Sequence, residues 1–396
     1  MKDEKKAPKL RFKGFTDDWE QCKLGDVAKI NSGKDYKGLQ PGKIPVYGTG
    51  GYMLSVNDKL SDIDAIGIGR KGTIDKPYYL NAPFWTVDTL FYVTPRGTVD
   101  ISFMFPLFKN INWKRYDEST GVPSLSKNTI KKIRVSFPQN NEQVKIGDLF
   151  QKITQIITLH EEKKRQLERL KSALLKKMFA DKSGYPAVRF NGFCDEWKKQ
   201  KLGDIVETIT DYVAAGSFAS LRENVIYRSE PCYAQLIRTA DLKSNFSKIA
   251  PVYVDKQAFD FLYRVSLDKE SVILPNIGNC GEVYYVDPHE LPYMRNVLGP
   301  NAILIRSSSL NNHFLSILFQ SHNFQKSLKL VISPNGQTKF NKTELKRIKM
   351  VLPMDVNEQN SLSAFFKMIN TAISLQEHKS NILKELKSSL LQNMFI

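Results

Sequence analysis

Residues 8–26 read PKLRFKGFTDDWEQCKLGD, and residues 186–204 read PAVRFNGFCDEWKKQKLGD. Eleven of these nineteen positions are identical, at an offset of 178 residues (186 minus 8). So close a match indicates an internal duplication, and a repeat of this kind organises a fold before any single element does. The sequence therefore predicts two related halves, each of which opens with this block.

A second pair of matching blocks closes each half. NEQ at 141–143 opens a long amphipathic segment that ends in LLKKMF, and NEQ at 357–359 opens one that ends in LLQNMF. Here the offset is 216 residues (357 minus 141), so the stretch between the matched blocks is 38 residues longer in the second half. The chain should alternate between variable modules and constant segments.

The constant segments have the periodicity of long helices. Apolar side chains recur at alternating spacings of three and four, as in a coiled-coil seam. The predicted seam consists of Ile146, Leu149, Ile153, Ile156, Leu167, Leu170 and Leu174, followed in the second copy by Leu362, Phe365, Ile369, Leu383, Leu386 and Leu390. Each helix should be about 55–60 Å long at ~1.5 Å per residue. Because a compact module leaves and returns at nearby points, we expect the two helices to be antiparallel.

Polar residues interrupt both seams at mid-length. His160 and Lys163 occupy this place in the first helix, and Gln376 and Lys379 in the second. Antiparallel pairing would set one polar layer against the other and could fix the register. The alternative is that the middle of the pair splays open and is solvated. No partner ligand lies one helical turn from either His160 or His378, so no metal site is expected there.

The stretches between the helices have the pattern of mixed α and β structure. Runs such as TLFYV at 89–93 and AILI at 302–305 are separated by Gly, Pro and Asn, which is typical of strands joined by turns. GRKGTI at 69–74 also resembles GNCGEV at 278–283. We predict an α+β fold: two similar α/β modules separated by two long antiparallel coiled-coil helices, with a pseudo-two-fold internal repeat. The expected boundaries are 1–140, 141–181, 182–355 and 356–396 for module, helix, module and helix.

The composition favours a polyanionic partner. Lys and Arg number 58 against 41 Asp and Glu, which gives a net charge of +17, and nucleic acid is the first candidate for such a surface. The alternative is a basic surface with no partner. No apolar run approaches the roughly 18–20 residues of a membrane span, and the charged N-terminus does not resemble a secretory signal, so we expect a cytoplasmic protein. The four cysteines lack zinc-site spacing.

Familiar catalytic motifs are missing or incomplete. GIGRKG at 67–72 has the letters of a dinucleotide-binding loop, but the residues after it do not predict a helix. NAPF at 81–84 lacks the first proline of an adenine-methyltransferase motif, and no phosphate-binding lysine follows Gly72. No spaced carboxylates or nucleophile motif suggest hydrolysis. We therefore expect no catalytic residue, no metal site and no cofactor in this chain.

The FKGF and FNGF openings at 12–15 and 190–193, the KLGD that follows each, and the NEQ helices together resemble the specificity subunits of type I restriction-modification enzymes. The resemblance covers essentially the whole chain. It implies a non-catalytic subunit whose two target-recognition domains each read one half of a split, asymmetric double-stranded DNA sequence. It also implies two modification (methyltransferase) subunits and restriction (motor-nuclease) subunits as partners, which would carry S-adenosylmethionine, ATP and Mg.

Two rival interpretations remain at this stage. A self-contained nuclease or methyltransferase would methylate or cut DNA alone, and the missing motifs argue against it. A structural coiled-coil protein with non-specific nucleic-acid binding would bind weakly, with strong salt dependence and no sequence preference.

The residues that contact DNA should be cationic or amide side chains on loops. The candidates are Lys34, Tyr36, Arg70, Lys71 and Lys127 in the first module and Arg238, Asn279, Gln337, Lys339 and Lys342 in the second. Partner docking should use outward faces of the helices, for example Glu161, Lys164, Arg165 and Lys171.

Overall fold

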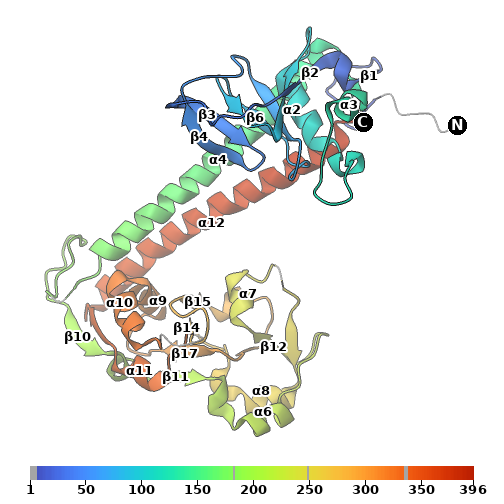
Figure 1. Cartoon of the computed structure of the whole chain (residues 1–396). Coiled ribbons are helices and arrows are strands. Elements are labelled where there is room, and N and C mark those ends of the chain that lie inside the picture. The colour runs from blue at the N-terminus through green and yellow to red at the C-terminus, as the bar shows by residue number, and fades with distance from the viewer. Residues whose placement is uncertain (1–6, 182, 248, 334–337) are drawn as a thin grey trace. The chain divides into compact units, whose positions relative to one another are not determined.

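The computed structural model describes residues 7–181, 183–247, 249–333 and 338–396. The chain divides into two compact units, unit 1 with residues 1–163 and 375–396 and unit 2 with residues 164–374. Two long helices, α4 (Asn140–Lys177) and α12 (Val356–Asn393), each contribute to both units. Each unit therefore holds one module, the first part of one long helix and the last part of the other (Figure 1).

The module of unit 1 is built on three small sheets. Its antiparallel four-stranded sheet has the order β2-β8-β5-β6, beside a three-stranded sheet β4-β3-β7 and a pair β1-β9. The elements are β1 (Glu20–Lys23), α1 (Leu24–Val27), β2 (Ala28–Ser32), β3 (Pro41–Gly48), β4 (Gly51–Val56), β5 (Ala65–Gly69), β6 (Tyr78–Leu80), β7 (Trp85–Thr86), β8 (Leu90–Pro95), α2 (Ile101–Asn110), η1 (Trp113–Tyr116), α3 (Lys127–Lys132) and β9 (Arg134–Phe137).

The module of unit 2 repeats this design with additions. Its sheets have the matching orders β11-β17-β14-β15, β13-β12-β16 and β10-β18. The elements are β10 (Lys198–Lys201), α5 (Leu202–Ile205), β11 (Thr208–Asp211), η2 (Tyr212–Ala215), α6 (Phe218–Asn224), β12 (Ala234–Ile237), α7 (Thr239–Lys243), β13 (Val252–Val254), α8 (Lys256–Phe261), η3 (Tyr263–Val265), β14 (Ser271–Pro275), β15 (Tyr284–Val286), η4 (Pro288–Glu290), β16 (Asn296–Leu298), β17 (Ala302–Arg306), α9 (Asn312–Gln320), α10 (His322–Val331), α11 (Lys342–Arg347) and β18 (Lys349–Leu352).

The predicted α+β fold with an internal repeat is confirmed by these matching sheets. The offset between the copies grows from 180 at the start of β2 and β11 to 206 at the start of β5 and β14. The short helices α6, α7 and α8 lie in this interval, so the extra length of the second module is largely inserted there.

An ion pair fastens each repeated opening block to the start of a long helix. Arg11 Nε and Nη2 donate to Glu142 Oε1 and Oε2 over 2.7 and 2.8 Å, and Arg189 makes the same two bonds to Glu358. The two carboxylates are only 1% and 2% exposed. We call these two ion pairs the clasps. They give the Arg of the opening block and the Glu of the NEQ motif a shared structural role.

The glutamine of each NEQ motif binds the backbone of its module. The Gln143 side-chain amide donates to Pro138 O over 2.8 Å and accepts from Asp100 N at 3.0 Å, at the start of α2. Gln359 makes the equivalent bonds to Pro353 O and Asn311 N, at 3.0 and 3.3 Å. Because both groups are buried, each bond removes the cost of an unsatisfied polar atom.

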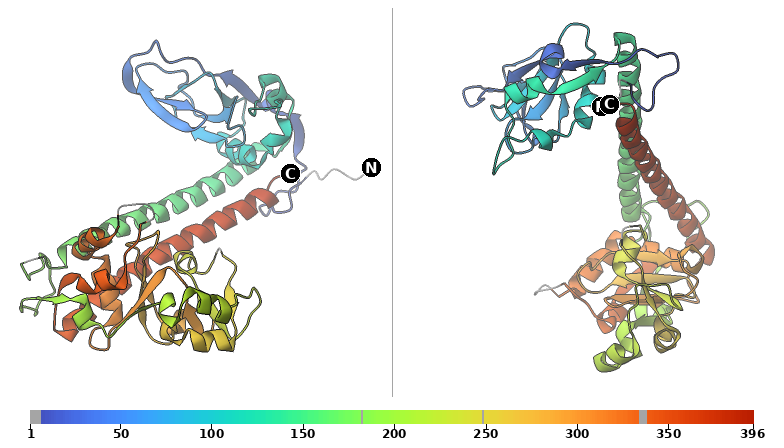
Figure 2. Two further views of the ribbon diagram at one scale, coloured as in Figure 1. Left: turned by 60° about the horizontal axis from the view of Figure 1, so that its bottom comes forward. Right: turned by 90° about the vertical axis from the view of Figure 1, so that its right-hand side faces the viewer.

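The end of the other long helix completes each unit. In unit 1, Phe395 packs against the rings of Trp19, Phe103 and Phe150 at centroid distances of 6.2, 5.4 and 5.9 Å. In unit 2, Phe179 packs in the same way against Trp197, Phe314 and Phe366. The end of one helix thus packs beside the start of the other, which confirms the antiparallel arrangement of α4 and α12 (Figure 2).

The polar layer predicted at mid-helix is present in unit 1. His160 Nδ1 and Gln376 Oε1 lie 2.7 Å apart, and both side chains are half-buried. The two residues occupy equivalent positions of the repeat, 216 apart. Lys163 and Lys379 are exposed and do not belong to the layer.

The predicted seam is wrong at three of its thirteen positions. Ile146, Ile153, Leu362 and Ile369 are buried as expected, and Leu149, Leu167, Leu174, Phe365, Leu383 and Leu390 are half-buried. Ile156, Leu170 and Leu386, however, are 43%, 49% and 46% exposed.

The buried stripe takes the next residue along the helix instead. Phe150, Ile157, Phe366 and Ser380 are buried, and Lys171 and Lys387 are half-buried. The spacing from Ile146 is therefore four then three, rather than three then four. The prediction was wrong because it took the most apolar residue at each step. In the structure, the aliphatic stems of Lys171 and Lys387 pack at two of the stripe positions.

Candidate nucleic-acid interface

In the first module, backbone hydrogen bonds hold the glycine-rich turn that links β5 to β6. Arg70 N donates to Thr89 O over 2.8 Å, and Arg70 O accepts from Leu125 N at 2.9 Å. Gly72 N donates to Pro123 O over 2.8 Å, and Gly72 has a φ of +90°, which favours glycine. No helix follows this turn, so a dinucleotide-binding loop is excluded.

The loop that faces this turn is ordered by Asp117. Its carboxylate accepts from Ser119 N at 3.0 Å and Ser124 N at 2.9 Å, and these backbone bonds lower the pKa of Asp117. Ser126 then caps α3, because its side chain accepts from Thr129 N at 3.1 Å. As a result, Lys127 begins α3 beside the glycine-rich turn.

A surface hollow of about 630 Å³ lies where the turn and the loop meet. Its lining residues are Ser32, Arg70, Lys71, Phe91, Ser124, Leu125, Ser126 and Lys127. The structure thus brings together three of the predicted contact residues, Arg70, Lys71 and Lys127. Whether they contact DNA stays a prediction.

Two other candidates of the first module lie outside this hollow. Lys34 is exposed, and its carbonyl accepts from Trp85 Nε1 at 2.9 Å. Tyr36 is half-buried and packs against the apolar cluster around Val46 and Trp85. Lys34 can therefore reach a ligand freely, whereas much of the Tyr36 ring is committed to packing.

The hollow has the chemistry of a phosphate-binding surface. The Arg70 guanidinium lies 6.0 Å from the centroid of the Phe91 ring, which limits where its donors can point. Ser32 and Ser124 add hydroxyls beside the three cations, and such side chains commonly bind DNA phosphates. The Ser126 hydroxyl instead donates to Glu118 Oε1 over 2.9 Å. Sequence reasoning missed Ser32 and Phe91 because both come from strands distant in sequence from the turn.

The second module forms the equivalent turn with different residues. Gly278 N donates to Thr338 O over 2.9 Å, and Ile277 pairs with Lys339 in an isolated bridge. Asn279 and Lys339 are exposed and lie near each other at this turn. Gln337 lies outside the described residues. The matching backbone bonds of Asn276, which donates to Asn301 O and accepts from Phe340 N, place Asn276 and Ile277 where the first module has Arg70 and Lys71.

Two candidates of the second module are engaged in ion pairs. Arg238 donates twice to the Asp241 carboxylate, at 2.7 and 2.8 Å, and to Ala250 O at 2.7 Å. The hydrogen-bonded carboxylate of Asp241 raises the pKa of Arg238. Lys342 Nζ lies 2.8 Å from Asp211 Oδ1. These ion pairs favour a structural role for both cations, and a DNA contact by either one stays a prediction.

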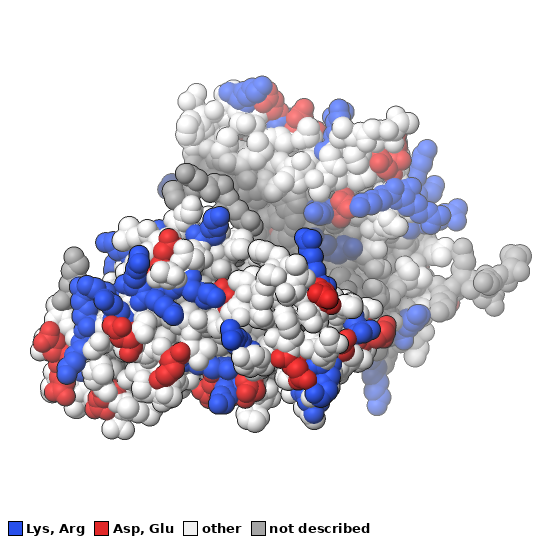
Figure 3. Space-filling model, turned by 90° about the horizontal axis from the view of Figure 1, so that it is seen from below, with Lys and Arg blue, Asp and Glu red and all other residues white. Residues whose placement is uncertain are grey.

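Charged side chains of both signs are dispersed over the face drawn in Figure 3. Figure 3 shows Lys and Arg side chains spread over the visible face with acidic side chains among them. Among the described residues, no group of three or more His, Cys, Asp or Glu could hold a metal ion. Within the same residues, no helix is long and apolar enough to cross a membrane.

The fold and this surface define a protein with two related α+β modules on a pair of antiparallel helices. The family model of the type I restriction modification DNA specificity domain matches residues 16–169 and 194–385. The chain therefore belongs to this family, and it is a specificity subunit of a type I restriction-modification system, which is a DNA-recognition subunit.

Individual relatives agree with this assignment. The type I restriction enzyme MjaVIII specificity subunit of Methanocaldococcus jannaschii is 20% identical over 417 aligned positions, covering 95% of this chain and 91% of the relative. The fold is similar to that of the S subunit of a type I restriction-modification system from M. genitalium, with a TM-score of 0.62, 13% identity, and coverage of 98% and 99% of the two chains. A chain from a study of complex assembly in the type I R-M system gives a TM-score of 0.53 with 14% identity, covering 94% and 96%.

Proposed function

We propose that each module reads one half of an asymmetric, bipartite DNA target. The observation that carries this proposal is the pair of equivalent turns, which share a backbone setting but present Arg70 and Lys71 in one module and Asn276 and Ile277 in the other. Different side chains on one scaffold suit two related modules that recognise different base sequences.

The paired helices are proposed to set the gap between the two half-sites. Helix α4 and helix α12 each contribute to both units, and the clasps fix each module to a helix start. A spacer of constant length would dictate the separation of half-sites, as dimer geometry does in other DNA-binding proteins.

The same helices are proposed to hold two modification subunits, with restriction subunits joining the complex. Apolar side chains are exposed at equivalent positions of the two helices: Leu159 and Leu375 are 64% and 46% exposed, and Leu170 and Leu386 are 49% and 46% exposed. Duplicated exposed apolar residues favour two copies of one partner.

The docking residues expected from the sequence need one revision. Lys171 does not belong to the outward face, because its ammonium donates to Gln320 Oε1 over 2.8 Å and its side chain is half-buried. Glu161 is exposed, but its Oε1 lies 2.6 Å from Lys384 Nζ, so Glu161 forms an ion pair with the other long helix.

The chain itself is proposed to be non-catalytic and to bind no cofactor. Adenine methylation with S-adenosylmethionine, and any translocation and cleavage with ATP and Mg, would belong to the partner subunits in the cytoplasm. The absence of a recognisable catalytic motif in the sequence supports this division of labour.

The test is to co-express the chain with its modification subunit in a methylation-free host and to map modified adenines by single-molecule sequencing. We expect a split motif with a constant gap. An uninterrupted motif, or no methylation from a complex shown to assemble, would contradict the proposal and favour the non-specific coiled-coil alternative.

A further inference from the structure

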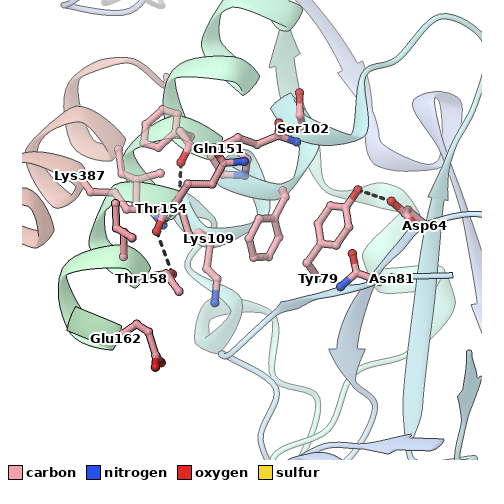
Figure 4. Close-up of a pocket in the computed structure, with 16 residues that line it drawn as sticks. Asp64, Tyr79, Asn81, Ser102, Lys109, Gln151, Thr154, Thr158, Glu162 and Lys387 are labelled. Atoms are coloured by element: carbon pink, nitrogen blue, oxygen red, sulfur yellow. Dashed lines mark hydrogen bonds between the residues drawn. The ribbon is translucent and has the colours of Figure 1, made fainter. Parts of the chain in front are cut away.

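A pocket of about 750 Å³ lies in unit 1 beside the long helices, outside the candidate DNA surface. Helices α2 and α4 form its walls together with the end of α12 and residues around β6 (Figure 4). Its apolar lining includes Tyr79, Phe105, Phe150 and Leu391. A volume of this size and a mainly apolar lining are typical of small-molecule sites.

Two lysine side chains reach this pocket from different helices. Lys109 comes from α2, and its Nζ lies 5.4 Å from the centroid of the Phe105 ring, within the range of a cation–π contact. Lys387 comes from α12, and its Nζ donates to Thr154 Oγ1 over 2.7 Å (Figure 4).

Both lysines are strained electrostatically. Burial lowers the pKa of Lys109, and the neighbouring charge of Lys387 lowers it further. Burial also lowers the pKa of Lys387. Lys387 is half-buried, whereas the Lys109 side chain is exposed. Because two neighbouring like charges repel each other, an anion placed between them would be stabilised.

The repeat supplies an internal comparison for this site. The sequence FMFPLFKN at 103–110 aligns with FLSILFQS at 314–321, which makes Gln320 the equivalent of Lys109. The offset of 216 between the long helices makes Lys171 the equivalent of Lys387. In unit 2 these two positions form a hydrogen bond, from Lys171 Nζ to Gln320 Oε1 over 2.8 Å. Unit 1 replaces this neutral acceptor with a second cation.

A second pair of substitutions changes the pocket wall beside Tyr79. His313 of unit 2 packs edge-on against Tyr285 with ring centroids 4.8 Å apart. The aligned residues of unit 1 are Ser102 and Tyr79, and both line the pocket. In unit 1 the ring of Phe105 packs edge-on against Tyr79 instead, with centroids 5.6 Å apart, so an apolar ring replaces the imidazole.

Two acidic residues, Asp64 and Glu162, also line the pocket. The Asp64 carboxylate accepts from Tyr79 Oη and from Ala82 N, both at 2.8 Å. Its hydrogen bonds therefore go to groups other than the two lysines.

We propose that this pocket binds a small amphipathic carboxylate, with its anionic group between Lys109 and Lys387 and its apolar body against Tyr79, Phe105 and Leu391. The apolar lining selects the body of such a ligand, and the two ammonium groups select its charge. This site is independent of the DNA-reading role of the modules.

Calorimetric titration of the full chain with octanoate, and separately with 1-octanol, tests the proposal. We expect octanoate to bind with one site per chain and 1-octanol to bind about tenfold more weakly or not at all, because the alcohol lacks the charge. Lys109→Gln introduces the residue that unit 2 has at this position, Gln320, and should weaken octanoate binding about tenfold or more. Lys171→Met is the matched control in unit 2 and should leave the affinity unchanged.

Lys387→Met tests the proposal even if Lys109→Gln does not fold. It should weaken octanoate binding to a similar degree. Hydrogen exchange should show octanoate protecting α2 and the end of α12. Equal binding of octanoate and 1-octanol, no octanoate binding, or full affinity in a folded Lys109→Gln or Lys387→Met variant would each overturn the proposal.

Discussion

The two clasps are expected to differ in strength, and removing each carboxylate measures the difference. Glu142→Ala would leave the Arg11 guanidinium without its counterion, and Glu358→Ala would do the same to Arg189. Breaking a buried ion pair by removing one partner typically costs about 3–5 kcal/mol. Because the arginine side chains are still 13% and 14% exposed, we expect the lower end of this range for Glu142→Ala.

Glu358 accepts a hydrogen bond from the indole of its module, and Glu142 does not. Trp197 Nε1 donates to Glu358 Oε1 over 3.2 Å, whereas Trp19 Nε1 has no hydrogen-bond partner in the structure. Glu358→Ala therefore also leaves a buried indole N–H unsatisfied, which costs about 1–3 kcal/mol more. The free energy of unfolding of unit 2 should fall by this additional amount.

The assay is hydrogen exchange read by mass spectrometry across a urea titration, because two units need not unfold in one transition. Peptides from residues 8–26 report on unit 1, and peptides from residues 186–204 report on unit 2. As a control, the double variants Arg11→Met with Glu142→Leu and Arg189→Met with Glu358→Leu remove both charges and should cost much less. Equal losses for the two alanine variants, or losses below about 1 kcal/mol, would refute the reasoning.

Three further predictions concern the DNA surface, pH and the helix pair. In the assembled complex, Arg70→Ala or Lys127→Ala should weaken DNA binding and reduce its salt dependence by about one unit of slope each, whereas Arg238→Ala should lower the stability of unit 2 and leave the salt slope unchanged; electrophoretic mobility shifts at several salt concentrations distinguish these effects. Burial and the charges of Lys367 and Lys171 lower the pKa of His313 to about 4, so the folded state binds fewer protons than the unfolded state between about pH 6.5 and 4. The unfolding free energy of unit 2 should therefore fall as pH drops through this window, by less than about 3 kcal/mol because the ring is only half-buried, and His313→Gln should flatten the fall in urea titrations at pH 7 and 5. Finally, His160→Leu together with Gln376→Leu should raise the melting temperature of unit 1, whereas His160→Leu alone should lower it because the Gln376 amide loses its partner; differential scanning calorimetry of all three chains checks both signs.

Much of the architecture could be predicted because the two halves of the chain can be compared with each other. The repeated block at 8–26 and 186–204 predicted two related modules, and the matching sheet orders confirm them. Because a compact module leaves and returns at nearby points, an antiparallel helix pair was predicted, and the contact between His160 and Gln376 agrees with it.

The seam phase could not be predicted from hydrophobicity alone. Leu170 and Leu386 are more hydrophobic than Lys171 and Lys387, so hydrophobicity places the leucines in the seam. In the structure, however, the leucines are exposed and the lysines are half-buried. The lysine stems pack while their ammonium groups find partners such as Gln320 and Thr154.

The contact residues were harder to predict because ion pairs depend on the fold. Asp241 lies three residues after Arg238, so that pairing had a visible signal in the sequence. Asp211 lies 131 residues before Lys342, and nothing in the sequence linked them before the sheet was known. Arg70, Lys71 and Lys127 lie together because the loop around Asp117 folds back onto the glycine-rich turn.

The central claim is that the two modules read their half-sites independently. The direct measurement is a map of modified adenines made after residues 20–140 are exchanged for the corresponding module of another family member, with the modification subunit unchanged. The account predicts that one half of the split motif changes, while the gap and the other half stay the same. A change in both halves, or a motif that does not respond to the exchange in an assembled and active complex, would contradict it.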